Sequence, residues 1–468
     1  MKASRTHIKP LETMHKNAFP DLSAPEIVCW DITMLCNQAC LSCYNFARQH
    51  KAKNVEDAKA MVERMRKEKI DPEPTPERAG GILDALAKAR VFEIDFMGGE
   101  PMCYPHIGRL VRMAHERNII SNFITNGTYV DEFLEQMDAE RGELPLRDFL
   151  KQTVNHIGFS LHGNTPKPHE AFTSLAGSFK KAISGMKKLD KIGISVGILF
   201  SPYEETKHCL YDTVKMLVKK EKIRLHTVYL NRLVKVGGCR INQDIMIRET
   251  DYLKMIEQLV KVKEDFGITA KTTDGVPYCR LLSYIYREHQ KKLEQMKPAQ
   301  RRAFAQKYLD AVGTCYFGTN NLSLNWNGMA KMCTIPPDRF NMGDITKKPL
   351  RQIWRELSRY RHSMQWAKKC IHGRELCLFY PECRGACKIT HTVNENESPA
   401  NIYSEDYMKV GFTAALHIAK YFGLDKANPE KQAHARHTLK GIVPKFKKRV
   451  FIRPEKKGFL LYEASRCV

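Results

Sequence analysis

Six short apolar runs mark the first half of the chain, and helix-like sequence separates each run from the next. They occupy residues 26–33, 91–97, 119–125, 154–161, 192–200 and 224–230. Apolar runs of this length that alternate with helices are typical of parallel strands joined in βα units. The pattern therefore predicts an α/β fold, and the lengths of its units suit a partial, six-stranded (β/α)6 barrel of the TIM type.

Proline and charge patterns predict the helices around these strands. Residues 54–70 are charged and helix-prone, and the prolines within 71–76 end that helix because proline lacks a backbone N–H and fixes φ. Thr75 then serves as the N-cap of the next helix, with Pro76 at its first position. A further amphipathic helix is predicted over 250–268.

The pattern changes after Thr272, where the alternation of strands and helices stops and cysteines become dense. We expect a lead-in, a barrel, a cysteine-rich domain with a helical insertion at about 283–310, and a basic helical tail. These four regions cover residues 1–25, 26–250, 251–400 and 401–468.

The composition is that of a globular protein. Of 468 residues, 43% are hydrophobic and 27% charged, which allows two or three domains and a large core. No run of about 18 uninterrupted apolar residues occurs, so no membrane partner is expected. The N-terminus as far as Asn17 lacks the apolar centre of a secretory signal. Fifteen cysteines without such a signal favour metal ligation in a reducing compartment, the cytoplasm, over disulfides.

The net charge is +24, from 76 Lys and Arg against 52 Asp and Glu. Basic residues are spread over the chain, with one denser run at 445–457. Three interpretations remain open: a solvated basic surface, a surface for an acidic substrate peptide, or an RNA-binding surface. Because no RNA-binding motif accompanies the charge, we do not expect nucleic acid as the partner.

Cys36, Cys40 and Cys43 stand at C-x3-C-x2-C spacing in one short loop after the first predicted strand. Thiolates are soft ligands that suit iron–sulfur clusters, and so short a loop can place three of them around one inorganic cube. A cubane has four irons, so one iron is left without a protein ligand and can chelate a small molecule. The alternative is a zinc loop or a structural cluster.

The three-cysteine loop resembles the signature of the radical S-adenosylmethionine (radical SAM) enzymes. The resemblance implies that the open iron holds the amino and carboxylate groups of SAM. One electron then splits the sulfonium, and the resulting 5′-deoxyadenosyl radical removes a hydrogen from the substrate. The family usually has an aromatic residue just before the third cysteine, beside the adenine. This chain has Ser42 there and Tyr44 just beyond Cys43, so Tyr44 is the candidate for that contact.

Further segments at predicted strand ends resemble the SAM-binding motifs of that family. Gly98-Gly99-Glu100 ends the second strand, where two glycines let the backbone approach a ligand closely. The family's equivalent engages the SAM amino group. Asn126 follows the third strand, although an Asn-Gly pair also forms ordinary turns. On the fourth strand, the resemblance assigns Ser160 to the SAM ribose or carboxylate, whereas His162 faces the substrate or is a hydrogen-bonded strand-end histidine.

A second cysteine group lies in the C-terminal half. It comprises a C-x12-G-x4-C segment and a C-x5-C-x3-C segment, formed by Cys315, Gly328 and Cys333 and by Cys377, Cys383 and Cys387. These segments resemble the SPASM extension of radical SAM enzymes. Two features depart from its pattern: six residues separate Cys370 from Cys377, and no cysteine follows Cys387 until Cys467. A zinc ribbon is the alternative, but these spacings are poor for paired zinc knuckles.

The SPASM resemblance implies two auxiliary 4Fe–4S clusters, which need at most eight thiolates. The candidates are Cys315, Cys333, Cys387 and Cys279 for the first cluster and Cys370, Cys377, Cys383 and Cys467 for the second. Without Cys467, one iron would be open or held by another group such as His372. Auxiliary clusters can feed an electron to the SAM site or accept one from a substrate radical.

The resemblance therefore implies a cytoplasmic radical SAM oxidoreductase with three 4Fe–4S clusters and SAM, reduced by a partner such as flavodoxin or ferredoxin. The expected substrate is a peptide or protein that undergoes post-translational oxidation or cross-link formation, as in sulfatase maturation. One alternative is a small-molecule enzyme that modifies porphyrin side chains in anaerobic haem synthesis. The other is a nucleic-acid-binding iron–sulfur protein, which the charge favours but Gly98-Gly99-Glu100 does not.

Overall fold

The computed structural model describes residues 22–45, 55–68, 71–313, 317–335, 341–363 and 418–424. The chain divides into two units, each considered by itself below. Unit 1 comprises Met1–Asp274 and Cys315–Met364, and unit 2 comprises Gly275–Thr314 and Gln365–Val468. Over the described ranges, no helix is both long enough and apolar enough to cross a lipid bilayer.

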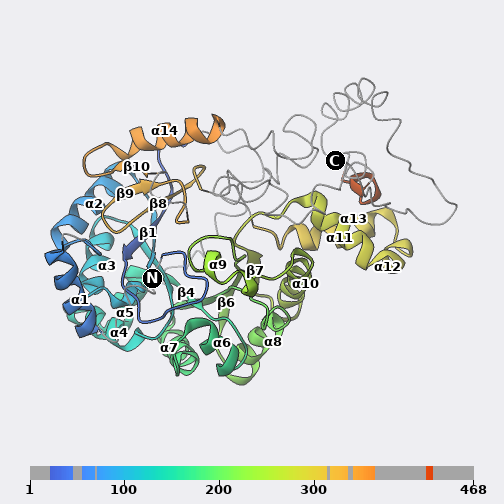
Figure 1. Ribbon diagram of the computed structural model, residues 1–468, viewed down its shortest axis with the longest axis horizontal. Helices are drawn as coiled ribbons and strands as arrows, with labels where there is room; N and C mark the ends of the chain where they lie inside the picture. Colours follow the sequence, from blue (N-terminus) through green and yellow to red (C-terminus); the bar gives the residue numbers. More distant parts are fainter. Residues whose placement is uncertain are drawn as a thin grey trace, which may run out of the picture. The chain divides into compact units, whose positions relative to one another are not determined.

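Unit 1 is built on one ten-stranded sheet with the order β10-β9-β8-β1-β2-β3-β4-β5-β6-β7. Strands β1 to β7 pair in parallel with their sequence neighbours (Figure 1). They are β1 Ile27–Thr33, β2 Glu93–Gly98, β3 Ile120–Thr125, β4 Val154–Ser160, β5 Ser195–Phe200, β6 Leu225–Leu230 and β7 Thr269–Thr272. The six predicted strands and the α/β barrel-like class are confirmed. The sequence pattern did not predict β7, because its four residues lack an apolar run.

Helices connect the parallel strands and lie around the outer face of the sheet (Figure 1). They are α1 Val55–Lys67, α2 Pro76–Ala89, α3 Ile107–Glu116, α4 Val130–Glu140, α5 Leu146–Thr153, α6 Pro166–Thr173, α7 Ser178–Ile192, α8 Leu210–Lys215 and α10 Glu249–Phe266. Shorter helical segments are η3 Pro101–Cys103, η4 Met216–Lys220, α9 Gly238–Ile241 and η5 Gln243–Ile245. Helix α2 begins as predicted, since Thr75 Oγ1 accepts a hydrogen bond from Arg78 N at 3.2 Å.

Aromatic side chains at alternate strand positions form the core between the sheet and the helices. The ring centroids of Trp30 on β1 and Phe96 on β2 are 5.9 Å apart, and Phe96 lies 5.3 Å from Phe123 on β3. Phe123 packs on Phe133 of α4 at 5.1 Å. Because side chains alternate across a strand, the neighbours of these residues point to the opposite, inner face of the sheet. That inner face carries polar groups, which include Asp31, Asp95 and Asn122.

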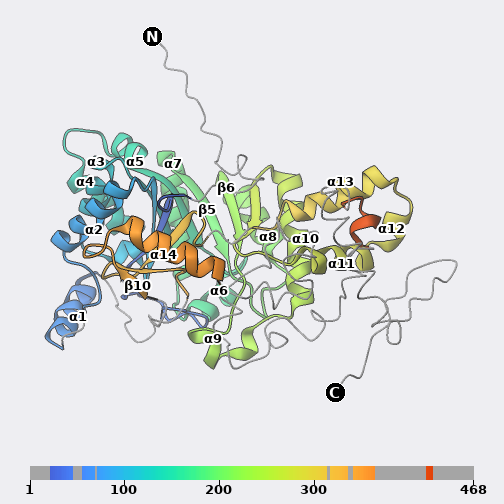
Figure 2. The ribbon, with the colours of Figure 1, turned by 90° about the horizontal axis from the view of Figure 1, so that it is seen from above.

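Three further strands extend the sheet beyond β1. They are β8 Asn321–Leu324, β9 Met329–Lys331 and β10 Asn341–Asp344, of which β8 pairs in parallel with β1. Arg78 of α2 anchors this part: its Nη2 lies 2.7 Å from Asp344 Oδ2 and 2.8 Å from Asn327 O, and its Nη1 lies 2.6 Å from Thr346 Oγ1. Helix α14, Leu350–Ser363, lies beside β10 and α2 (Figure 2).

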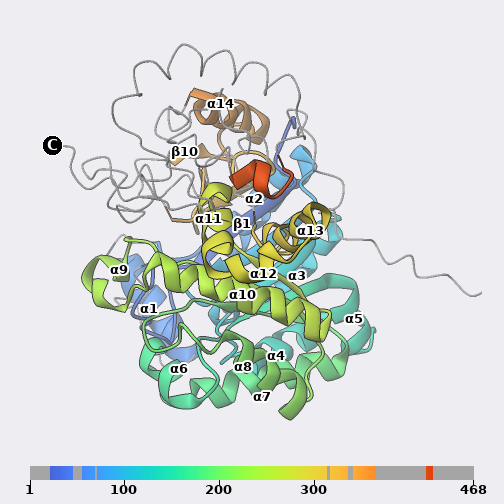
Figure 3. The ribbon, with the colours of Figure 1, turned by 90° about the vertical axis from the view of Figure 1, so that its right-hand side faces the viewer.

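Unit 2 is described over three helices and one short segment. The helices are α11 Tyr278–Glu288, α12 Gln290–Glu294 and α13 Pro298–Leu309 (Figure 3). Residues 418–424 pack on them, with the rings of Tyr421 and Tyr286 centred 5.0 Å apart. The guanidinium of Arg301 lies 4.4 Å from the centre of the Tyr421 ring. Aromatic and cation–π contacts thus join this distant segment to α11 and α13.

Candidate active site

The loop that carries Cys36, Cys40 and Cys43 leaves the carboxyl end of β1. All three are thiols outside any disulfide; Cys36 is buried, and Cys40 and Cys43 are partly buried. Burial raises the pKa of the Cys36 thiol well above its usual range, and the nearby Cys40 adds to the effect. Iron favours the thiolate form of cysteine, so a bound cluster would offset this cost.

The end of α6 holds the backbone of the cysteine loop from one side. Ala39 N donates a hydrogen bond to Thr173 O at 3.1 Å, and Leu41 N donates to Phe172 O at 3.0 Å. These two bonds satisfy alternate amides of the loop with carbonyls of the last helical turn, which would otherwise lack partners. The loop is therefore fixed by a helix end that lies far from it in the sequence.

A pair of glycines holds the same loop from the other side. Gly238 N donates to Cys43 O at 2.8 Å, and Asn242 Nδ2 donates to Leu41 O at 2.9 Å. A Cβ on Gly238 would lie 2.2 Å from Leu41 O, and one on Gly237 would lie 2.3 Å from Cys43 O. Only glycine permits so close an approach. These glycines were not predicted from the sequence, although two adjacent glycines in the connection after the sixth strand were a signal.

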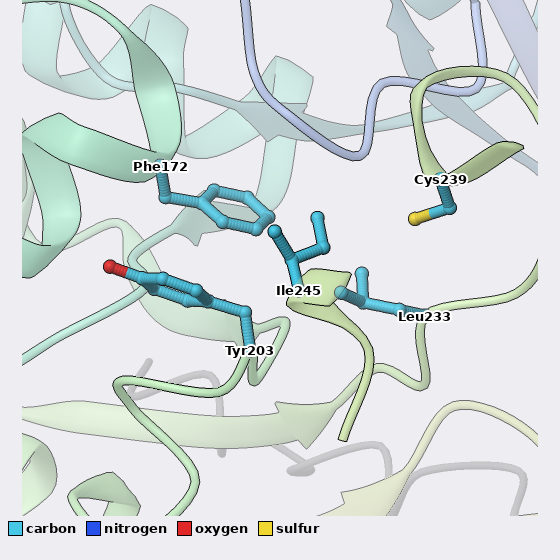
Figure 4. Close-up of a cluster of buried hydrophobic side chains, with 5 residues drawn as sticks. All are labelled: Phe172, Tyr203, Leu233, Cys239 and Ile245. Atoms are coloured by element: carbon cyan, nitrogen blue, oxygen red, sulfur yellow. The ribbon is translucent and has the colours of Figure 1, made fainter. Parts of the chain in front are cut away.

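A cluster of buried apolar side chains supports the loop from beneath (Figure 4). Its members come from α6, α9, η5 and the segments that follow β5 and β6, and they are Phe172, Tyr203, Leu233, Cys239 and Ile245. Cys40 and Leu41 of the loop pack against this cluster. Apolar packing and hydrogen bonds to the backbone of Ala39, Leu41 and Cys43 thus position the loop that carries the three thiols.

The Gly98-Gly99-Glu100 turn packs directly against the chain that leads into the cysteine loop. Gly99 N donates to Thr33 O at 2.7 Å and Glu100 N donates to Leu35 O at 2.7 Å. Gly98 has a φ of 127°, and a Cβ on Gly99 would lie 2.0 Å from Leu35 O. The glycines are thus required for contact with the protein's own backbone as well as suited to contact with a ligand.

Glu100 and Asn126 meet beside the first cysteine. The Glu100 carboxylate is 1% exposed and accepts hydrogen bonds from Thr125 Oγ1 at 2.6 Å, Asn126 N at 2.7 Å and Met102 N at 3.0 Å. Burial raises the pKa of Glu100 to about 7, although these donors partly offset the shift. Asn126 Nδ2 lies 3.7 Å from Cys36 Sγ. The structure therefore brings together three residues that were predicted separately.

The fourth strand ends at the same edge of the sheet. Ser160 is the last residue of β4 and is half-buried. His162 Nδ1 accepts a hydrogen bond from Ser201 N at 3.2 Å, and its ring centre lies 4.4 Å from that of Phe172. Burial lowers the pKa of His162 well below its usual range, so the ring is neutral. Of the two hypotheses for His162, these contacts favour the hydrogen-bonded strand-end residue.

Two of the predicted auxiliary-cluster cysteines lie in described parts of the chain. Cys333 follows β9 in unit 1, Cys279 lies on α11 in unit 2, and both are buried. The other candidate ligands, Cys315, Cys370, Cys377, Cys383, Cys387 and Cys467, lie outside the described residues, as does His372. The assignment of the auxiliary ligands therefore stays a prediction.

The donor set of the loop fits an iron–sulfur cluster. Three thiols on one short loop are the soft ligands that such a cluster takes. Gln38, between the first two cysteines, is 2% exposed, and among the described residues its Nε2 has no hydrogen-bond partner. A buried amide N–H within the loop that lacks a partner fits a bound group with sulfur acceptors. In the described part of the chain, the loop included, no three His, Cys, Asp or Glu side chains are grouped around a single metal ion. Each iron of a cubane takes only one thiolate, so the fit of the loop rests on the type and spacing of its cysteines.

Two family models match the chain. The model of the radical SAM superfamily matches residues 30–217, and that of SPASM, an iron–sulfur cluster-binding domain, matches residues 315–388. The first match contains the cysteine loop, Gly98-Gly99-Glu100, Asn126 and Ser160. The second begins at Cys315 and includes Cys387.

By their names, the similar curated proteins include enzymes of porphyrin and haem synthesis and enzymes that modify peptides. The chain is 23% identical to Fe-coproporphyrin III synthase of Methanosarcina barkeri over 341 residues, which cover 71% of this chain and 74% of that one. It is 28% identical to PqqA peptide cyclase of Gluconobacter oxydans over 125 residues, 26% of this chain and 32% of that one. Among solved structures, anSMEcpe with bound AdoMet and the Cp18Cys peptide has a TM-score of 0.53 at 14% identity, covering 88% of this chain and 100% of that one. The likeness to anSMEcpe supports the fold alone.

Proposed function

Because this chain is a member of the radical SAM superfamily that carries a SPASM iron–sulfur cluster-binding domain, we propose that it cleaves SAM reductively and abstracts a hydrogen atom from its substrate. One observation carries this proposal: the cysteine loop, the Gly98-Gly99-Glu100 turn and Asn126 meet at one edge of the sheet, with Asn126 Nδ2 3.7 Å from Cys36 Sγ. When bound, a four-iron cluster with one open iron supplies the electron that splits the sulfonium of SAM.

Each residue at this edge has a proposed role. The thiolates of Cys36, Cys40 and Cys43 hold the cluster. The backbone of Gly98-Gly99 and the Ser160 side chain contact SAM. Glu100 acts indirectly, because its carboxylate oxygens already accept three hydrogen bonds from the protein, two of which hold the end of β3 and the turn after it in place.

We propose a peptide or protein as the substrate. Asp31, Glu93 and Asp95 lie on the inner face of β1 and β2, and burial raises the pKa of Asp31 to about 7 and that of Asp95 to about 6. Asp31 and Asp95 already accept hydrogen bonds from Tyr44 and Asn122, and their ionised forms would gain from a further donor or a cation. The amide and amine groups of a peptide are such donors, whereas the carboxylates of a porphyrin side chain are not.

A tetrapyrrole is the second candidate substrate, and the extent of sequence similarity favours it. The match to Fe-coproporphyrin III synthase covers 71% of this chain, whereas the match to PqqA peptide cyclase covers 26%. A match over 341 residues must extend into both halves of this 468-residue chain, whereas one over 125 residues need not. The inner-face carboxyl groups and the length of the match therefore point to different substrates.

The reaction class is tested by the release of 5′-deoxyadenosine from SAM by anaerobically reconstituted protein with dithionite. We expect release by the native chain and none by Cys40→Ala. Cys209→Ala, which replaces a partly buried thiol outside the loop, should keep the activity. Release no greater than that of Cys40→Ala, with candidate substrates supplied, would contradict the proposal.

The substrate class is tested with two iron tetrapyrroles, iron coproporphyrin III and a precursor that carries additional acetate side chains, because iron coproporphyrin III is by name the product of the Methanosarcina barkeri relative. If the peptide proposal holds, both compounds leave 5′-deoxyadenosine release unchanged and are recovered intact, whereas a short peptide encoded beside the gene stimulates release and changes mass. Stimulated release together with loss of carboxyl groups from the porphyrin would establish the second candidate instead.

The SPASM part is proposed to hold two auxiliary clusters that pass electrons between a donor, such as flavodoxin or ferredoxin, the SAM site and the substrate. Three cubanes predict about twelve irons per chain. An iron count near four in the reconstituted protein would remove the auxiliary clusters from the proposal, and it would leave the SAM chemistry untouched.

A further inference from the structure

Gln38 makes two contacts with the thiols on either side of it. Its backbone N donates to Cys36 Sγ at 3.4 Å, and its side-chain Oε1 accepts the S–H of Cys40 at 3.4 Å. The side chain is 2% exposed. Its Nε2 has no partner among the described residues, so one half of the amide is bonded and the other half is not.

Binding of a cluster would remove the donor from the hydrogen bond between Cys40 and Gln38 Oε1. A cysteine that coordinates iron is a thiolate and has no proton to donate, so Cys40 Sγ becomes an acceptor. Gln38 Oε1 would then face a negatively charged sulfur. A half-turn about the last side-chain torsion exchanges Oε1 and Nε2, and this torsion between sp³ and sp² atoms is soft. The turn breaks no existing hydrogen bond of Nε2 to the described residues.

We propose that Gln38 is a positioning residue whose amide reverses on cluster binding, so that Nε2–H donates to the Cys40 thiolate and raises the reduction potential of the SAM-binding cluster. This inference rests on the proposed function of the loop. Donors to a ligating sulfur favour the more negative, reduced state of a cluster and tune its potential. The sulfur of Cys36 already accepts N–H hydrogen bonds, from Gln38 N and from Asn126 Nδ2. The reversed Gln38 amide would give the sulfur of Cys40 an N–H donor as well.

The test is a redox titration of the full, anaerobically reconstituted chain, followed by electron paramagnetic resonance. Only the signal that changes on addition of SAM is analysed, which separates this cluster from the auxiliary ones. Gln38→Leu and Gln38→Met remove the amide; Met keeps the length and flexibility of the side chain. Both variants should keep the iron content of the native chain and show a lower midpoint potential. Gln352→Leu, which replaces an exposed glutamine on α14, should leave the potential unchanged.

An unchanged midpoint potential in both Gln38 variants would overturn the proposal, because it would show that the Gln38 amide does not affect the cluster. If Gln38→Leu fails to take up iron, Gln38→Met alone decides by the same criterion. Failure of the underlying function has a different result, because Cys40→Ala would then retain the SAM-responsive signal of the native chain.

Discussion

Tyr44, the residue after the third loop cysteine, donates a hydrogen bond from its hydroxyl to Asp31 Oδ1 at 3.1 Å. Asp31 lies on the inner face of β1 and is 3% exposed. The bond therefore ties the end of the cysteine loop back to the strand from which the loop leaves. The predicted contact of Tyr44 with the adenine of SAM would therefore be made by its ring, because its hydroxyl already donates to Asp31.

Tyr44→Phe removes this donor and keeps the ring. We expect it to lower the free energy of unfolding by about 1–2 kcal/mol, since the Asp31 carboxyl stays buried without its partner. The pKa of Asp31 should rise further, because the Tyr44 hydrogen bond holds it down. Urea unfolding at pH 8 measures the change in stability. Tyr211→Phe breaks an exposed bond of the same type, 2.6 Å from Asp265, and should cost less; equal losses would show that burial of the pair is irrelevant.

Gly238→Ala tests whether close backbone contact holds the cysteine loop. The added Cβ would lie 2.2 Å from Leu41 O, so the loop must move. We expect most of the iron bound by this loop to be lost, read as a fall in iron content and in the SAM-responsive resonance signal. The matched control is Gly81→Ala in α2, where a Cβ meets nothing within 4 Å. That change should keep the iron and stabilise the protein by up to about 1 kcal/mol, because alanine is the better helix former. Native iron content in Gly238→Ala would refute the role of the glycine pair.

The parts of the site that follow from local sequence could be predicted, and those that depend on distant contacts could not. The cysteine loop and Gly98-Gly99-Glu100 follow apolar strands, so the ends of parallel strands bring them to one edge. The contacts of Gly238 with the loop join segments far apart in the sequence: two adjacent glycines indicate a close backbone approach, but no local pattern says which segment approaches. Likewise, the carboxylate of Glu100 binds the turn after β3, which its motif alone did not indicate. Strand β7 escaped prediction because its residues are polar and few.

Glu73 provides a pH test away from the cysteines. It is 4% exposed, it accepts a hydrogen bond from Thr33 Oγ1 at 2.9 Å, and burial raises its pKa to about 7. The folded state therefore holds a proton that the unfolded chain has lost above about pH 4.5. The stability that the protonated Glu73 contributes is therefore fully present below about pH 4.5 and is lost as the pH rises through about 7.

Glu73→Gln keeps an acceptor for Thr33 and cannot ionise. Relative to the native chain, we expect no gain in unfolding free energy at pH 4 and a gain of up to about 3 kcal/mol at pH 8, because burial raises the pKa of Glu73 to about 7. Urea unfolding of both proteins at pH 4, 6 and 8 measures this difference. Glu135→Gln, at an exposed position of α4, should give no such trend. A constant difference between native chain and Glu73→Gln at all three pH values would contradict the burial of an ionisable carboxyl group.

The ion pair between Arg78 and Asp344 joins α2 to β10. Strand β10 pairs with β9, which ends just before Cys333. The atoms of the ion pair are 2.7 Å apart, and the side chains are 32% and 14% exposed. Arg78→Met keeps the apolar stem and removes the hydrogen bonds to Asp344, Thr346 and Asn327 O. We expect each of Arg78→Met and Asp344→Asn to cost about 1–2 kcal/mol of unfolding free energy, with a coupling of about 1 kcal/mol in the double-mutant cycle.

The exposed pair Arg117–Asp84 is the matched control, since its atoms are 2.8 Å apart but Asp84 is 67% exposed. Its coupling should not exceed about 0.5 kcal/mol, because solvent screens an exposed pair. Equal coupling in the two cycles would mean that Arg78 contributes no more than an ordinary surface charge. If the larger coupling is found, loss of Arg78 should also loosen the strand that precedes Cys333. Arg78→Met should then bind less iron than Arg117→Met when both are reconstituted under the same conditions.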